Sequence, residues 1–253
     1  MQIDLSCRTA LITGATGQLG RIMARTLADC GANLVIHYHE NEAKAIELKE
    51  ETEKLGIRSV TVQADITDER SIYRMKDLAE SNLGKVDIVV ANAVIQYEWT
   101  TILNQSALDY ERQFYSCVMQ NVYLAKAFVP SMIDRKYGRM IGINTECSML
   151  NNANQSAYVA GKRGMDGLYR VLAKEVGEHR ITVNQVAPGW TISDRDREDG
   201  TASRPEYEAG VPLRRRGEDQ DIANTVAFLA SDLADFITGA FIPVCGGNVM
   251  PAI

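Results

Sequence analysis

Residues 8–20, RTALITGATGQLG, place a short β-rich run directly before three closely spaced glycines and the start of a segment with helical period. Glycine permits a tight turn, and its missing Cβ lets backbone N–H groups approach a pyrophosphate at the N-terminus of the following helix. The spacing differs from the standard G-x-G-x-x-G fingerprint, so a glycine-rich turn without a ligand is the alternative interpretation. The residues that we expect to contact a dinucleotide here are Gly14, Gly17, Gln18, Leu19 and Gly20.

The rest of the chain repeats this alternation of short β-rich runs and longer amphipathic segments. The expected strands lie at residues 8–13, 33–37, 59–63, 86–91, 139–144, 181–186 and 241–244. Helical apolar faces are formed by Leu168, Val171, Leu172 and Val176 in one segment, and by Ile222, Val226 and Leu229 in another. Because strand, helix and strand in succession pair in parallel through right-handed crossovers, the sequence predicts an α/β fold with a doubly wound parallel sheet of about seven strands. No linker interrupts the pattern, so we expect a single domain over residues 1–253.

Composition narrows the class of protein. The 253 residues include 45% hydrophobic and 24% charged side chains, which is ordinary for a globular domain and excludes a disordered or fibrous chain. A formal charge of −6 without a run of Lys and Arg disfavours nucleic-acid binding and favours small-molecule chemistry. The five cysteines are an odd number without the close pairs of a zinc site, so we expect no metal and a reduced, cytoplasmic environment. We expect no signal peptide and no membrane span, since no uncharged apolar stretch reaches about 18 residues.

Polar residues follow two of the expected strands. Asp65, with Ile66 beside it, closes the third strand, and Asn92 follows the fourth. In open parallel sheets ligands bind at the carboxyl ends of strands, so these residues are candidates for dinucleotide binding. Either polar side chain could instead serve as a turn or cap residue.

The sequence YVAGK places Tyr158 and Lys162 four residues apart, on one face of a segment with helical period. They follow the fifth expected strand, whose end carries Thr145 and Ser148. Lowering a tyrosine pKa by about 3 units needs roughly 4 kcal/mol. One ammonium about 4 Å away supplies on the order of 4 kcal/mol at an effective dielectric of about 20. Tyr158 is therefore a candidate acid/base, with a nearby hydroxyl to hold a substrate oxygen.

At this point the sequence resembles the short-chain dehydrogenase/reductases over nearly the whole chain, with the motifs in the family's order and spacing. The resemblance implies a Rossmann-like seven-stranded domain, a nicotinamide dinucleotide, and hydride transfer between that cofactor and a carbonyl or alcohol carbon. It also implies that Tyr158 is the acid/base, that Lys162 binds the nicotinamide ribose, and that Pro188 and Gly189 lie near the nicotinamide. The motifs are TGATGQLG, Asp65, residues 91–93, YVAGK, residues 184–189 (NQVAPG), residues 211–230, residues 237–239, and Gly246 with Gly247.

The sequence departs from the family pattern at several positions. Thr145 stands where the family has its catalytic serine, and it keeps the hydroxyl; Ser148 is a nearby substitute. Cys117 stands where the family has an asparagine that positions a water, and a thiol is a weak donor and acceptor. Asn121, one turn later on the same face, is a candidate to compensate. Two family glycine positions are occupied by Gln18 and Val94.

The choice between NAD and NADP rests on the end of the second strand. The family position that distinguishes the two cofactors aligns with Tyr38, and a carboxylate there would bind the ribose 2′-OH. Its absence leans slightly towards NADP. However, residues 34–43 contain no Arg or Lys, and Glu40 argues for NAD, so both cofactors stay open.

Residues 190–217 break the strand–helix alternation and carry a charged run, which predicts either a substrate lid or a solvated surface loop. The leading functional hypothesis is an NAD(P)-dependent oxidoreductase acting on a small carbonyl or alcohol. The alternatives are a dinucleotide-binding protein with weak or lost catalysis that serves as a redox-responsive module, and an epimerase or dehydratase. The family resemblance also implies a homotetramer.

Overall fold

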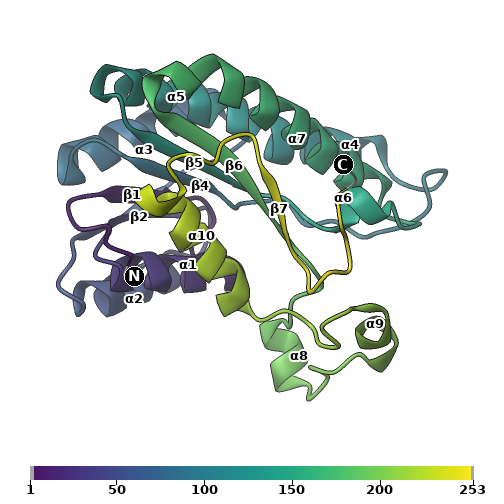
Figure 1. Cartoon of the computed structure of the whole chain (residues 1–253). Helices are drawn as coiled ribbons and strands as arrows, with labels where there is room; N and C mark the ends of the chain where they lie inside the picture. The colour runs from purple at the N-terminus through teal and green to yellow at the C-terminus, as the bar shows by residue number, and fades with distance from the viewer. Residues whose placement is uncertain (1–2, 252–253) are drawn as a thin grey trace.

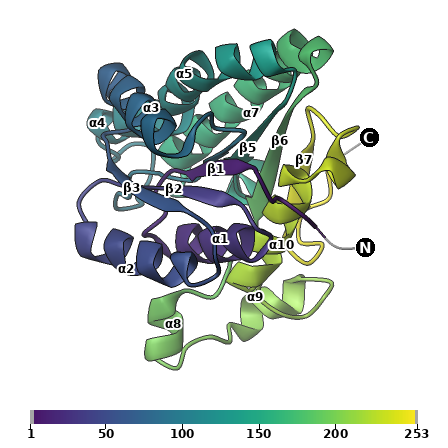
Figure 2. The same ribbon diagram turned by 90° about the vertical axis from the view of Figure 1, so that its left-hand side faces the viewer.

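The computed structural model describes residues 3–251 and has a central sheet of seven parallel strands in the order β3-β2-β1-β4-β5-β6-β7. The strand order reverses between β1 and β4, which creates the crevice where doubly wound folds bind ligands. Figures 1 and 2 show the twisted sheet between two layers of helices. The strands are β1 (Thr9–Ile12), β2 (Asn33–Tyr38), β3 (Ser59–Gln63), β4 (Ile88–Ala91), β5 (Gly138–Ile143), β6 (Ile181–Pro188) and β7 (Phe241–Val244).

The inner strands are buried on both faces, as the near-continuous apolar runs require. Successive residues of a strand pack in two separate cores. Ile12 of β1 and Ile36 of β2 face one layer of helices, whereas Leu11 of β1 and Val35 of β2 face the other. The first layer contains α1 (Gln18–Asp29), α2 (Glu42–Glu53) and α10 (Asp219–Ala230). The second layer contains α3 (Glu69–Leu83), α4 (Ala107–Phe114), the π-helical turn η1 (Tyr115–Met119), α5 (Gln120–Arg135) and α7 (Ser156–Val176). The prediction of a doubly wound, single-domain parallel sheet is confirmed.

Short helices complete the chain, and local capping fixes several helix starts. Asn41 accepts a hydrogen bond from the N–H of Lys44 at the start of α2, and Asp68 caps α3 through the N–H of Arg70. The remaining elements are α6 (Cys147–Leu150), η2 (Gly177–His179), α8 (Asp194–Glu198), α9 (Pro205–Gly210) and η3 (Asp232–Ala234). Within residues 3–251 no helix is long and apolar enough to cross a membrane.

The apolar face predicted for α7 is partly wrong. Val176 is buried, but Val171 is 54% exposed, and Leu168 and Leu172 are only half-buried. The buried face instead runs through Gly161, Lys162, Met165, Tyr169 and Ala173. This face was missed because it contains a lysine, a glycine and a tyrosine, which an apolar pattern does not count. The face predicted for α10, Ile222, Val226 and Leu229, is fully buried.

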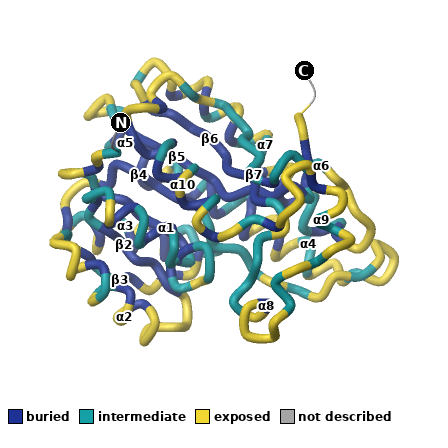
Figure 3. The backbone as a smooth tube through the Cα atoms, turned by 60° about the horizontal axis from the view of Figure 1, so that its bottom comes forward, coloured by how far each residue is buried: buried dark blue, intermediate teal, exposed yellow. Residues whose placement is uncertain are grey.

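Residues 190–217 leave the sheet after β6 and return to it at α10. They form α8, α9 and connecting segments, and a single bridge pairs Thr191 with Gly217 where the two ends meet. Figure 1 shows α8 and α9 projecting beyond the carboxyl ends of the strands, and Figure 3 shows that much of this segment is exposed or half-buried.

Candidate functional site

A cavity of about 1320 Å³ lies at the carboxyl ends of the strands, between the sheet and residues 190–217. It brings together most of the site residues that the sequence predicted. The exceptions are Gly20, Tyr38 and Cys117, which do not line it. The predicted residues that do line it are Gly14, Gly17, Gln18, Leu19, Asp65, Ile66, Asn92, Thr145, Tyr158, Lys162, Pro188 and Gly189.

The glycine loop forms a cradle that suits a phosphate group. Gly14 has φ +62°, a left-handed conformation that favours glycine. The N–H groups of Gln18 and Leu19 at the start of α1 form no hydrogen bond among the described residues, and both residues line the cavity. These N–H groups are therefore available donors at a helix N-terminus. A Cβ on Gly20 would lie 2.2 Å from the Gly14 carbonyl oxygen, so Gly20 serves the close packing of the turn.

His37, which the sequence analysis missed, holds this loop in place. Its Nδ1 lies 2.9 Å from the N–H of Gly14, and its Nε2 lies 3.1 Å from the carbonyl oxygen of Ala64. These partners require a neutral imidazole that accepts at Nδ1 and donates at Nε2. Burial lowers the pKa of His37 to about 4, which agrees with the neutral form. Only the buried position at the end of a strand could have indicated this role.

Asn92 joins the loop to β4. Its Nδ2 donates to the carbonyl oxygens of Thr13 and Gly14, at 3.0 and 3.2 Å. Asp65 accepts hydrogen bonds from the N–H and the hydroxyl of Thr67, so it shapes a turn and also lines the cavity. Asp65 and Asn92 therefore both stabilise the local backbone and line the cavity.

The end of β2 differs from the expectation. The Tyr38 side chain packs in the core, and its hydroxyl donates to Glu42 at 3.2 Å, so it faces away from the cavity. Because side chains alternate along a strand, the neighbours of Tyr38 line the cavity in its place. These neighbours are His37 and His39, followed by Glu40 and Asn41.

Tyr158 and Lys162 project from α7 into the other half of the cavity. The Lys162 Nζ lies 5.7 Å from the centroid of the Tyr158 ring and donates to the Ile143 carbonyl oxygen at 2.5 Å. Trp99 stacks on the Tyr158 ring with centroids 5.8 Å apart. The backbone N–H of Tyr158 donates to the Tyr97 hydroxyl at 2.7 Å. Trp99 thus packs against the phenol ring, while Tyr97 fixes the backbone of the same residue.

The expected lowering of the Tyr158 pKa is wrong for this arrangement. Burial raises the pKa of Tyr158 well above its ordinary value, and a hydrogen bond with the Thr145 side chain opposes this rise only in part. Burial also lowers the pKa of Lys162, whose ammonium is directed to a backbone carbonyl. Desolvation of the phenolate is the largest cause of the rise in the Tyr158 pKa, and attraction to the Lys162 ammonium is not among its causes. The site holds a protonated phenol that can donate to a substrate oxygen.

Thr145, and not Ser148, presents its hydroxyl to the cavity. Thr145 Oγ1 accepts from the N–H of Cys147 at 3.2 Å, and Thr145 lines the cavity together with Tyr158, whose pKa the Thr145 side chain lowers. The Ser148 hydroxyl donates to the Thr145 carbonyl oxygen at 2.8 Å, and Ser148 does not line the cavity.

Cys117 lies in η1, behind the cavity. Its Sγ is 3.7 Å from Gln113 Oε1, and a Cβ on Gly161 would lie 3.3 Å from the same sulfur. Asn121 does not replace the family asparagine in contact with Lys162: its Nδ2 donates to the Cys117 carbonyl oxygen, and its Oδ1 accepts from Tyr169, both at 2.7 Å. The amide of Asn121 thus stabilises the π-helical turn.

A second polar group in the cavity was not predicted. Glu146 is buried, and its carboxylate accepts from the Tyr207 hydroxyl at 2.9 Å and from Asn248 Nδ2 at 3.0 Å. Burial raises the pKa of Glu146, and these hydrogen bonds oppose that shift. The three residues come from the end of β5, from α9 and from the segment after β7, so no local motif could have shown the cluster. Gly189 packs beside it, because a Cβ there would lie 2.9 Å from the Tyr207 hydroxyl.

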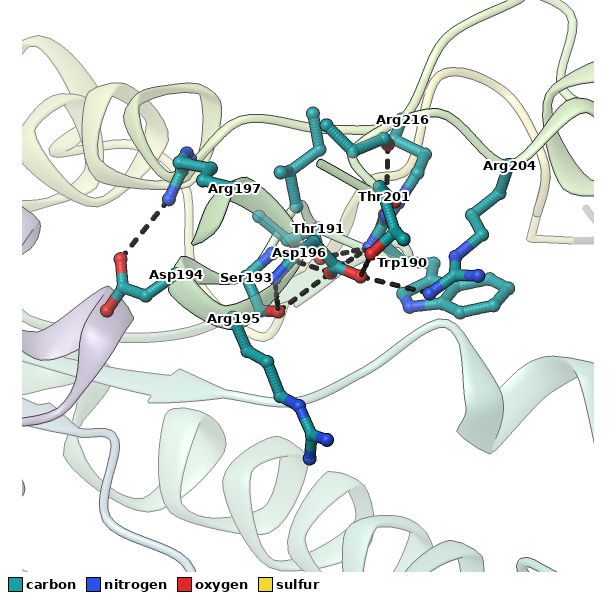
Figure 4. A network of polar contacts seen from close by, with 12 residues as sticks. Trp190, Thr191, Ser193, Asp194, Arg195, Asp196, Arg197, Thr201, Arg204 and Arg216 are labelled. Carbon is teal, nitrogen blue, oxygen red and sulfur yellow. Dashed lines mark hydrogen bonds and ion pairs between the residues drawn. The ribbon is translucent and has the colours of Figure 1, made fainter. Parts of the chain in front are cut away.

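A polar network orders residues 190–217 (Figure 4). Asp196 accepts from Ser193 Oγ at 2.7 Å, from Arg216 at 2.9 Å and from Arg204 at 3.1 Å. The hydrogen bonds from Arg216 and Ser193 hold the pKa of Asp196 well below its usual range. Arg216 is buried and also donates to the backbone carbonyl oxygens of Trp190, Thr191, Thr201 and Ala202.

Gln18 connects this segment to the glycine loop. Its Nε2 donates to the Ile192 carbonyl oxygen at 2.7 Å and to Asp219 at 2.6 Å. Its Oε1 accepts from the N–H of Asp194 at 3.3 Å, and the Asp194 carboxylate pairs with Arg21 at 2.5 Å. The side chain that replaces a family glycine therefore turns away from the cradle and binds residues 190–217.

Comparisons with known proteins agree with this site. Residues 14–248 match the family model described as enoyl-(acyl carrier protein) reductase. The chain is 34% identical to 3-oxoacyl-[acyl-carrier-protein] reductase FabG of Staphylococcus epidermidis, over 96% of this chain and 99% of that protein. It is 36% identical to the FabG protein of Escherichia coli, over 96% of this chain and 98% of that protein.

Solved structures give the same result. A 7α-hydroxysteroid dehydrogenase complexed with NADH and 7-oxo glycochenodeoxycholic acid superposes with a TM-score of 0.89 at 31% identity, covering 98% of this chain and 96% of the other. An NAD⁺-bound xylitol dehydrogenase has the same TM-score at 24% identity, which shows the shared fold. The fold and site thus define a nicotinamide-dinucleotide oxidoreductase. The chain belongs to the short-chain dehydrogenase/reductase family, and the prediction of an enzyme that uses NAD or NADP on a small-molecule substrate is confirmed.

Proposed function

We propose that this enzyme reduces the carbonyl group of a small substrate to an alcohol, with Tyr158 as the proton donor. The observation that carries the proposal is that Thr145, Tyr158 and Lys162 line one cavity, with the Lys162 Nζ 5.7 Å from the centroid of the Tyr158 ring. A protonated phenol is suited to the reductive direction, because the substrate oxygen must gain a proton. A binding module without catalysis is not favoured, because a hydroxyl that follows β5 and a phenol and a lysine from α7 line the same cavity, and the phenol and the lysine are fixed by contacts with Trp99 and with the Ile143 carbonyl oxygen.

The chain's own residues divide the work. The glycine loop and the first N–H groups of α1 would bind the pyrophosphate, and Asp65, Ile66 and Asn92 would line the nucleoside part. Pro188 and Gly189 would lie against the nicotinamide, which supplies the hydride when the dinucleotide is bound. Thr145 would hold the substrate oxygen while the Tyr158 hydroxyl gives up its proton. Cys117 and Gly20 would act through packing alone.

We propose NAD as the preferred cofactor, which departs from the slight lean towards NADP. Among residues 3–251, Lys162 is the only Lys or Arg that lines the cavity, and it lies at the catalytic end. The opposite end has Glu40 and Asp65, whose carboxylates would repel a 2′-phosphate. The hydroxysteroid dehydrogenase that superposes on this chain is complexed with NADH, which supports the same choice.

Residues 190–217 would act as the lid of the substrate end, since Trp190, Thr191 and Tyr207 line the cavity. We also propose a homotetramer in the cytoplasm. Exposed apolar side chains on α4 and α7, including Leu108, Phe114 and Val171, support the assembly, and free cysteines support a reducing compartment.

The Tyr158→Phe variant tests this function. It removes one hydroxyl, so the variant should fold and bind NADH like the wild type, yet lose about 10³-fold in kcat for ketone reduction. Steady-state kinetics with a panel of small ketones, beside calorimetric titration with NADH, measures both. If a reductase activity survives the change nearly intact, Tyr158 is not the proton donor.

A further inference from the structure

The Glu146 carboxylate stands in the substrate end of the cavity with no counter-charge from the protein. Glu146 exposes 3% of its surface; its oxygens accept hydrogen bonds from the Tyr207 hydroxyl and from Asn248, and the backbone N–H of Trp190 also acts on the carboxylate, yet none of these groups carries a charge. Across residues 3–251 no Lys, Arg or His forms an ion pair with it. Burying a carboxylate without a cation is unfavourable, so such a group points to a ligand that supplies one.

The cation that lines this cavity, Lys162, and two cations on the segment that carries Tyr207, Arg204 and Arg216, are engaged elsewhere. Lys162 donates to the Ile143 carbonyl oxygen. Arg204 and Arg216 lie over the Trp190 ring, and both bind the Asp196 carboxylate. None of these three side chains is left to neutralise Glu146.

Gln155 is a second, independent sign of a missing donor. It lines the same cavity, exposes 8% of its surface, and within the described chain its Oε1 has no hydrogen-bond partner. The Gln155 side chain lies against the thiol of Cys147, the residue next to Glu146. A buried amide oxygen without a hydrogen-bond donor is unfavourable. The Glu146 carboxylate and Gln155 Oε1 would therefore both be stabilised by a ligand that donates hydrogen bonds.

The hydroxyls assigned to catalysis share one cavity with Glu146. Glu146 follows Thr145 in the sequence, and both residues line the cavity together with Tyr158. The stacked rings of Trp99 and Tyr158 form an aromatic wall of the same cavity. Aromatic faces attract cations, and a carboxylate beside them strengthens that preference.

We propose that the substrate of this enzyme carries a protonated amino group near its carbonyl carbon, and that Glu146 binds this ammonium. The inference rests on the proposed function, because Thr145 and Tyr158 locate the carbon that reacts. The ammonium provides the missing counter-charge, and its N–H groups reach acceptors such as Gln155. Glu146 is then a specificity-determining residue, because a carboxylate-bearing substrate would meet it as a like charge.

Two ring ketones of nearly equal shape test the proposal: 4-piperidone, protonated at its ring nitrogen, and neutral tetrahydropyran-4-one. Calorimetric titration into the enzyme saturated with NAD⁺ reads binding without turnover, because the oxidised cofactor cannot reduce a ketone. The result is therefore distinct from the test of hydride transfer by Tyr158→Phe. If NAD⁺ does not bind, the same titration of the enzyme without dinucleotide measures the affinities for the two ketones.

We expect 4-piperidone to bind at least about tenfold more tightly than tetrahydropyran-4-one. Glu146→Gln, which removes the charge and keeps the size, should reduce the difference to within about twofold. Tyr207→Phe removes a hydrogen bond to the carboxylate but keeps its charge, so the preference for the cation should persist. Glu206→Gln is the matched control, because it removes an exposed carboxylate at the mouth of the same cavity and should leave the preference unchanged.

Three results would overturn the proposal. The first is equal or tighter binding of the neutral ketone to the wild type. The second is no detectable binding of the cation at millimolar concentration. The third is a preference for the cation that Glu146→Gln leaves intact, which would place the ammonium elsewhere in the cavity.

Discussion

The cavity has two ends that are constructed in different ways: the dinucleotide end, beside Gly14 and Asp65, and the substrate end, beside Glu146 and Tyr158. At the dinucleotide end, His37 and Asn92 hold Gly14 from the neighbouring strands β2 and β4. At the substrate end, Glu146 binds Tyr207 and Asn248, which lie 61 and 102 residues further along the chain. The first set of contacts follows from the order of strands in a parallel sheet, whereas the second depends on where residues 190–217 and the C-terminal segment fold back.

This difference separates cofactor binding from substrate choice. The residues of the dinucleotide end are fixed by the strand order, so the same end can serve many substrates. The substrate end depends instead on contacts from residues 190–217 and from the C-terminal segment. Gln18 and Arg21 are exceptions, because they bond directly from α1 to Ile192 and Asp194.

After Tyr158→Phe, Thr145→Val should have the largest effect, and this effect should be confined to the substrate end. The change removes the hydroxyl beside Tyr158 at nearly constant volume, and loss of one such donor lowers kcat/KM by about 10²-fold. The dissociation constant for NADH should be unchanged, and Thr145→Ser should keep most of the activity. Steady-state kinetics and calorimetry measure the two quantities. A large change in NADH affinity would show that the two ends are not separable in this way.

Acid should weaken the dinucleotide end through His37. Its pKa is about 4 in the folded protein and about 6.5 when exposed, so the unfolded state binds the proton first as the pH falls. Stability is therefore intact above pH about 6.5 and is lost as the pH falls towards 4, by about 2 kcal/mol at pH near 5. Urea unfolding at several pH values measures the loss.

His37→Asn is the matched variant, because its side-chain oxygen can accept from the Gly14 N–H but does not titrate. The wild type should lose about 2 kcal/mol more than His37→Asn between pH about 7 and about 5. Equal slopes for the two proteins would show that the neutral imidazole does not fix this loop.

Cys117→Ala should have the smallest effect, although the family has a functional asparagine at this position. The thiol does not line the cavity, and its nearest polar partner is Gln113 at 3.7 Å, so activity should stay within about threefold of the wild type. Circular dichroism confirms the fold, and steady-state kinetics gives the activity. A loss beyond about 30-fold in a folded variant would show that the sulfur participates in proton transfer.

Much of the fold could be predicted because buried parallel strands read as short apolar runs, and β3 and β7 have the predicted bounds. The face of α7 was mispredicted because its buried side carries Lys162 and Tyr169, which pack against the sheet and α5. Polar residues on a buried face follow from function and tertiary packing, which a count of apolar positions does not include.

The candidate site was predictable where a motif is local. The glycine loop and the pair Tyr158 and Lys162 show themselves by spacing, whereas His37 and Glu146 depend on partners that only the tertiary structure brings near. The direction of the Tyr158 pKa shift could not be derived from the sequence either. The attraction of an ammonium can be estimated from helix geometry, but the larger desolvation of the phenol depends on residues around it, including Trp99.

The proposed preference of the cavity for NAD is tested most directly by titration of the wild-type enzyme with NADH and NADPH. NADH should bind with a dissociation constant in the micromolar range. NADPH should bind at least about tenfold more weakly, because Glu40 and Asp65 line this end of the cavity and, among residues 3–251, no Lys or Arg does. Tighter binding of NADPH would contradict the cofactor preference. No binding of either dinucleotide would contradict the proposed oxidoreductase site itself.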